Sequence, residues 1–191
     1  MNRKAVLPTG LACLILAACN SADTGGAPDP AMQEAIDRVA IEDMVVEYYA
    51  HLGGGDASAF DDYFTEDAVF DVNGNIATGR EEIEALYGSI GEDPSSASNQ
   101  GGPFRMLLSN PVIEVDGDSA TASFIWTGVG NPAIDAPPVL LEQGREFDRL
   151  VKVDGEWKFS HRVVIADSGL PEGQYPDYTP RRDFGVEDLN P

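Results

Sequence analysis

The chain has 191 residues, of which 42% are hydrophobic and 24% are charged, a composition typical of one globular domain with tails. Its 33 acidic and 12 basic residues give a formal net charge of −21 at pH 7. Such a surface repels phosphate backbones and anionic lipid headgroups, which argues against a nucleic-acid-binding protein.

Residues 1–18 have the order of a bacterial export signal. MNRK supplies a positive start, AVLPTGLACLI an apolar run too short to span a bilayer comfortably, and LAAC a small-residue cleavage site ending at Cys19. This segment resembles the lipobox of lipoproteins, which implies cleavage before Cys19 and acylation of its thiol. Because Asn20 rather than Asp follows, the sorting rule implied by the resemblance favours the outer membrane, with the domain facing the periplasm. An ordinary secretory signal with a coincidental cysteine is the alternative.

Residues 19–29 are small, polar and rich in Gly and Pro, and predict a flexible tether. Asp29 and Pro30 then predict a helix start, as N-cap and first helical residue. Apolar residues at helical spacing carry this helix to Leu52, before three glycines.

The next elements are short. Thr78 and Glu81 stand at the spacing of a capping box, which predicts a helix directly after a hairpin. In chain order we expect a helix over 57–64, a strand over 67–72, a turn at 73–75, a strand over 76–78 and a helix over 81–90.

From Phe104 onward the chain alternates as long strands do, and two Asp-Gly dipeptides predict tight hairpins. Helices gathered before a meander of three or four antiparallel strands indicate an α+β fold with a curved sheet around the first helix. The domain is expected over residues 30–167, followed by a tail over 168–191 that is rich in Pro, Gly and Asp.

The segments AIEDMVVEYYAHLGGGDASAFDDYFTEDAVFDVNG, TGREEIEALY, SNPVIEVDGDSATASF and VKVDGEWKFSHRVV resemble the SnoaL-like branch of the nuclear-transport-factor-2-like superfamily. The resemblance covers residues 33–167. It implies a cone-shaped α+β domain with an apolar pocket, often a homodimer through the sheet face. Dehydratase and dehydrochlorinase members use a His and an Asp, and alignment puts Met106 and Gly53 at those positions. The usual catalytic dyad is therefore absent.

Other residues could replace the dyad. The segment EWKFSHRVVIAD, residues 156–167, predicts a strand, and its period of two places His161 on one face with Trp157 and Phe159. Asp148 or Glu146 on the preceding predicted strand could orient the imidazole of His161. His161 is the candidate acid or base, assisted by Tyr48 or Asp148, and a satisfied core histidine is its alternative. A carboxylate-only site is another route, through three acidic residues that could point inward: Asp71, Glu146 and Asp148.

Aromatic, apolar and amide side chains are the candidate pocket lining, although about half of them would be plain core. His51 near the helix end is a pocket-wall or a rim residue. The predicted lining is Tyr49, His51, Phe64, Phe70, Met106, Leu108, Asn110, Trp126 and Phe147. Two distant histidines predict no metal site, and no cofactor is expected.

The sequence predicts a lipid-anchored domain that binds a small apolar molecule. A lyase, dehydratase or isomerase acting on steroid, polyketide or aromatic-type substrates is the first alternative. An interaction module of the cell envelope, with the sheet face docking a partner, is the second.

Overall fold

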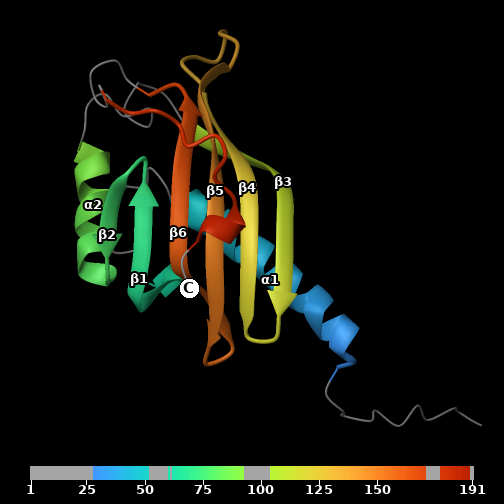
Figure 1. The fold of residues 1–191 in the computed structure, drawn as a ribbon. Coiled ribbons are helices and arrows are strands. Elements are labelled where there is room, and N and C mark those ends of the chain that lie inside the picture. The colour runs from blue at the N-terminus through green and yellow to red at the C-terminus, as the bar shows by residue number, and fades with distance from the viewer. Residues whose placement is uncertain (1–27, 52–59, 61, 93–103, 171–176, 190–191) are drawn as a thin grey trace, which may run out of the picture.

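The computed structural model shows one curved six-stranded sheet, with both α-helices in the N-terminal half of the described chain (Figure 1). This is the expected α+β architecture. The strand order is β2-β1-β6-β5-β4-β3. The structure describes residues 28–51, 60, 62–92, 104–170 and 177–189. The elements are α1 (Pro30–His51), β1 (Phe64–Val72), β2 (Asn75–Thr78), α2 (Arg80–Glu92), β3 (Phe104–Asp116), β4 (Ser119–Gly130), β5 (Val139–Val153), β6 (Glu156–Ser168) and the short 3-10 helix η3 (Val186–Asp188).

The sheet has two differently covered faces. We call the face covered by α1 the inner face, and the opposite face, crossed by residues 177–189, the outer face (Figure 1). The larger apolar core lies on the inner face and includes Tyr48, Phe64 and Trp126. A smaller core lies on the outer face between the sheet and the C-terminal segment. None of the helices in the described ranges is long and apolar enough to cross a membrane.

Helix α1 begins where the sequence predicts. The carboxylate of Asp29 accepts from the backbone N–H of Ala31 at 2.9 Å, as an N-cap should. The carboxylate of Asp37 then ties α1 to the sheet, accepting from Nζ of Lys152 at 2.5 Å and from Nε1 of Trp157 at 3.3 Å. The predicted last residue, Leu52, lies outside the described residues.

The first hairpin differs from its prediction in two details. Strand β1 begins at Phe64, so residues 62 and 63, expected in a second helix, form a 3-10 turn instead. The turn uses Asn73 and Gly74, whose φ angles of 55° and 90° suit a type I′ hairpin. The backbone N–H of Thr78 donates to Glu82 at 2.8 Å rather than to Glu81.

The long strands confirm the predicted meander. β3, β4, β5 and β6 pair antiparallel in chain order, and β6 also pairs with β1 in parallel. The β5 strand is therefore central and presents side chains alternately to the inner and the outer face.

Candidate functional site

The path of β6 decides which side chains reach the inner face. Up to Phe159 the β5–β6 hairpin pairs regularly from its turn. At Ser160 the register shifts by one residue, and its hydroxyl donates to the carbonyl of Arg149 at 3.2 Å. One extra residue reverses the face to which the following side chains point. Arg162 therefore joins Phe159 on the inner face, and His161 points to the outer face.

Glu146 on β5 holds the Arg162 side chain. Nη2 of Arg162 donates to Oε2 of Glu146 at 2.7 Å, and the hydroxyl of Tyr49 on α1 donates to the same oxygen. Asp148 places Oδ1 3.6 Å from Nη1 of Arg162, close enough for an ion pair but too far for a hydrogen bond. The side chains of Glu146, Asp148 and Arg162 are 0% exposed. We call these three residues with Tyr49 the buried charged cluster.

Aromatic rings surround the guanidinium of Arg162. Its Cζ lies 4.1 Å from the ring centre of Tyr48, 4.3 Å from that of Phe159 and 5.3 Å from that of Tyr49. Contacts of this kind stabilise a desolvated cation by about 2 kcal/mol. They also fix where the guanidinium points, because Tyr48 is itself packed edge-on against Phe60.

Two residues away on β5, Gly144 makes room for an indole. A Cβ at Gly144 would lie 2.3 Å from Cζ2 of Trp126, so the absence of a side chain is required for this packing. Nε1 of Trp126 is buried and makes no hydrogen bond to the described residues. Burial raises the pKa of Glu142, the next inner-face position, to about 7. The inner face of β5 thus carries three carboxyl groups in a row broken by glycine, of which Glu146 and Asp148 are fully buried and Glu142 is half-buried.

The cluster keeps several polar atoms without partners. In the described part of the chain, Oε1 of Glu146, both carboxyl oxygens of Asp148, and Nε and Nη1 of Arg162 make no hydrogen bond. Each buried polar group left unbonded costs about 1–3 kcal/mol, and more where it is charged. These five atoms therefore offer both donors and acceptors to an oxygen-bearing molecule.

Burial raises the pKa of both carboxyl groups. Desolvation is the largest cause for Glu146 and for Asp148, and Arg162 opposes the rise in both. The pKa of Asp148 ends well above its ordinary value, since the charge of Glu146 adds to the effect of burial. Among the described residues both oxygens of Asp148 lack a hydrogen bond, whereas Glu146 is held by Arg162 and Tyr49, so Asp148 is the carboxyl group more readily protonated. Burial also raises the pKa of Tyr49, so its hydroxyl stays a donor.

A profile of the SnoaL-like domain matches residues 33–163, well over half of the chain. The chain belongs to the SnoaL-like domain family. No curated protein matches it.

Solved structures share the fold of this SnoaL-like domain. A variant of Rv3472, a protein of unknown function from Mycobacterium tuberculosis, is 24% identical over 80% of this chain and 86% of its own, with a TM-score of 0.61. An NTF2-like protein with a cystatin-like fold from Novosphingobium aromaticivorans is 21% identical over 75% and 94%, with a TM-score of 0.60. A proposed scytalone dehydratase from the same organism is 23% identical over 72% and 89%, with a TM-score of 0.57. At these identities the likeness shows the fold alone.

The structure brings most of the predicted lining of this SnoaL-like domain to the inner face. Tyr48 and Tyr49 contact Arg162 directly, and Asp148 forms an ion pair with it. The remaining inner-face residues belong to the core or pack against it: Phe64, Phe70, Met106, Leu108 and Trp126. Whether any of them contacts a ligand stays a prediction.

Other predicted residues lie elsewhere. Phe147 is on the outer face, against Phe184 of the C-terminal segment, because it alternates with Glu146 and Asp148 along β5. His51 is exposed at the end of α1, 6.1 Å from the ring centre of Tyr63. Asn110 is exposed at a β3 bulge, with a φ of 53°.

Two acid–base predictions are corrected by these placements. His161 does not share a face with Phe159, because the bulge intervenes, and it pairs with Arg149 instead of approaching Asp148. Asp71 forms an ion pair with Arg181 of the C-terminal segment at 2.9 Å, so it does not point into the inner core.

Sequence reasoning missed Arg162, which a strict period of two had placed opposite the core. One signal was available. Glu146 and Asp148 are two acids on one face of a central strand, and burying both requires a cation from a neighbouring strand. The candidates on β6 were Lys158 and Arg162. Among the described residues no group of His, Cys, Asp and Glu side chains is arranged to hold a metal ion.

Proposed function

We propose that this SnoaL-like domain binds a small, largely apolar molecule on the inner face of its sheet, with the polar end of the molecule at the buried charged cluster. The atoms of Glu146, Asp148 and Arg162 that make no hydrogen bond to the described residues carry this proposal. A charged group without exposed surface, set in an aromatic core, is strongly penalised unless its hydrogen bonds are completed.

The atoms define what the polar end must offer. Nε and Nη1 of Arg162 are donors, and the carboxyl group of Asp148 is a donor whenever it holds a proton, which favours a ligand oxygen that accepts. Oε1 of Glu146 is an acceptor and suits a ligand hydroxyl. A neutral hydroxy-carbonyl compound meets both requirements, while the aromatic rings around Arg162 suit an apolar body.

Native mass spectrometry of the domain after incubation with an envelope lipid extract tests this proposal. The wild-type chain should retain a small molecule, and Asp148→Asn and Glu146→Gln should retain at least about tenfold less, because each removes one of the required groups. His161→Asn is the matched control, since His161 lies on the outer face. Absence of any bound molecule on the wild-type chain, with circular dichroism showing it folded, would contradict the proposal.

A lyase, dehydratase or isomerase is the second candidate. It is favoured by two buried carboxyl groups, Glu146 and Asp148, that flank one guanidinium and whose pKa values burial raises. Oε1 of Glu146 would take a proton next to a carbonyl that Arg162 polarises, and Asp148 would donate to a leaving hydroxyl or a developing enolate. His161 has no part in this scheme.

The enzyme candidate requires a protonated Asp148. The rate of product formation from hydroxy-ketone test substrates should therefore fall as the pH rises through the raised pKa of Asp148. Asp148→Asn should abolish turnover yet leave part of the binding. Turnover that Asp148→Asn and Glu146→Gln leave unchanged would remove this candidate while leaving the binding proposal open.

We further propose that the domain faces the periplasm, anchored to the outer membrane by acylated Cys19. The order of the regions in residues 1–19 supports this location. The homodimer implied by the family resemblance also stays a proposal, and residues 177–189 cover part of the sheet face on which it would form.

A further inference from the structure

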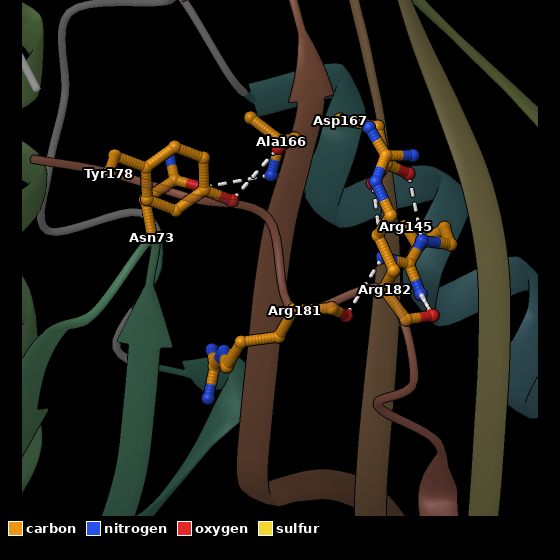
Figure 2. A network of polar contacts seen from close by, with 7 residues as sticks. All are labelled: Asn73, Arg145, Ala166, Asp167, Tyr178, Arg181 and Arg182. Carbon is orange, nitrogen blue, oxygen red and sulfur yellow. Dashed lines mark hydrogen bonds and ion pairs between the residues drawn. The ribbon is translucent and has the colours of Figure 1, made fainter.

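Two arginines on the outer face of β5 bind the main chain of the C-terminal segment. Arg145 donates from Nη2 to the carbonyl of Arg181 at 3.0 Å and from Nη1 to that of Arg182 at 3.4 Å (Figure 2). Arg149 donates from Nη2 to the carbonyl of Leu189 at 2.7 Å. Contacts to carbonyl groups hold an extended segment without regard to its side chains.

Arg145 is positioned before it meets the segment. Its Nε and Nη2 donate to the two carboxyl oxygens of Asp167 on β6 at 2.8 and 3.0 Å (Figure 2). A bidentate pair of this kind fixes the plane of the guanidinium. The remaining N–H groups of Arg145 are thereby aimed outward, away from the sheet, where the carbonyls lie.

An apolar floor lies between the two arginines. Phe147, Val163 and Ile165 form it, and Phe184, Val186 and Leu189 of the segment pack on it. The rings of Phe147 and Phe184 meet edge-on with centres 5.3 Å apart, and Leu189 is only 2% exposed. The segment therefore presents an aromatic residue and, two and five residues later, two aliphatic ones.

The first residues of the C-terminal segment make their own contacts with the sheet. The hydroxyl of Tyr178 donates to the carbonyl of Ala166 at 2.8 Å (Figure 2). Arg181 forms an ion pair with Asp71 at 2.9 Å. The segment lies beyond residue 163, where the family match ends, whereas Asp71 lies within the match.

We propose that the outer face of β5 and β6 is a peptide-binding site, and that it takes the C-terminal segment of a second copy when its own segment is displaced. The site recognises main-chain carbonyls through Arg145 and Arg149. It selects an aromatic residue followed at the second and fifth positions by aliphatic residues, as in Phe184, Val186 and Leu189.

The covalent connection favours the chain's own segment over a free peptide in binding to the outer face. Six residues, 171–176, join Leu170 to the segment, and a short connection gives its own segment an effective concentration on the order of millimolar. A free peptide at micromolar concentration therefore loses to the resident segment. It should bind only when that segment is weakened.

The test uses the full chain carrying Phe184→Ser and Leu189→Ser, which keeps the segment but removes its apolar contacts. A fluorescein-labelled peptide of residues 177–191 is titrated and followed by anisotropy. The double variant should bind it saturably at micromolar concentration, with at least about tenfold higher affinity than the wild-type chain, whose own segment competes. A peptide carrying the same two serines is the matched control and should not bind. Arg145→Gln added to the double variant should weaken binding at least about tenfold.

Three outcomes would overturn the proposal. They are a folded double variant that does not bind the peptide, equal binding to the double variant and the wild type, and a double variant that fails to fold. Hydrogen exchange on the wild-type chain gives a second, independent test. Amides of residues 181–189 should exchange at least about tenfold faster than those of β5 and β6, because a ligand-like segment opens without global unfolding. Equal protection would make the segment part of the core and would also reject the proposal.

Discussion

Asp148 and Arg162 lie opposite one another on β5 and β6 because Ser160 is an extra residue of β6 that has no partner on β5. Continued regularly from its turn, the hairpin that pairs Leu150 with Phe159 would put His161 opposite Asp148. The bulge replaces a histidine with a guanidinium at the inner face. It thereby decides that the buried partner of Asp148 is permanently charged.

Deleting Ser160 tests this role of the bulge. The deletion should give a regular ladder and keep residues 161–168 on their native faces, because Phe159 would then directly precede His161, which already lies opposite Arg149. We therefore expect the cooperative thermal transition seen by circular dichroism to be retained. Ser160→Ala is the control and should lower the free energy of unfolding by about 1 kcal/mol, since it removes only the bond to Arg149. A deletion variant that loses its cooperative transition would contradict the assignment of Ser160 as the extra residue.

Arg162→Met should destabilise the domain by about 3–5 kcal/mol, because it leaves two buried acids without their cation. Urea unfolding followed by tryptophan fluorescence measures the change. Arg38→Met, on the exposed side of α1, is the control and should shift the free energy by about 0.5 kcal/mol or less. Adding Glu146→Gln and Asp148→Asn to Arg162→Met should recover part of the loss. If the triple variant is less stable than the single one, the cluster is not the source of the effect.

The fold was predictable because its signals are local and agree with one another. Asp29 before Pro30 marks the start of α1, and Asn73–Gly74 and Asp154–Gly155 mark tight turns, each with an ordinary physical reason. The order of helices and long strands then leaves few arrangements for the sheet.

The site was only half predictable because a bulge has no such local signal. Tyr48, Tyr49, Glu146 and Asp148 follow from strict alternation and helical spacing, which hold over α1 and most of β5. Arg162 depends on a shift at Ser160, which nothing in the residue types announces. Phe147 was misplaced for a different reason: an apolar residue next to two acids suggests the core, and the acids themselves occupy it.

Cys19→Ala should release the protein from the membrane fraction of a bacterial host. The lipobox resemblance implies that acylation of this thiol is the anchor, and a single substitution removes it. Labelling with radioactive palmitate and fractionation of the envelope measure both steps. Cys13→Ala is a matched control, because Cys13 lies in the apolar run of the signal and should leave with it. Equal labelling of the Cys19→Ala and wild-type proteins would disprove the anchor.

Glu142→Gln should stabilise the domain at alkaline pH and leave it nearly unchanged in acid. Burial raises the pKa of Glu142 from an ordinary 4.5 to about 7, so the folded state holds a proton that the unfolded state has lost between these values. The stability linked to this proton is complete below about pH 4.5 and declines as the pH rises through about 7.

Glutamine does not titrate, so the variant lacks this decline. At pH 8 it should be more stable than the wild type by about 2 kcal/mol, and at pH 4 the difference should be below about 0.5 kcal/mol. Chemical unfolding at a series of pH values measures both. Glu114→Gln, at an exposed position on β3, should run parallel to the wild type throughout. If Glu142→Gln also runs parallel, Glu142 is ionised at neutral pH in the folded domain, and the inner face of β5 carries one more charge than we infer.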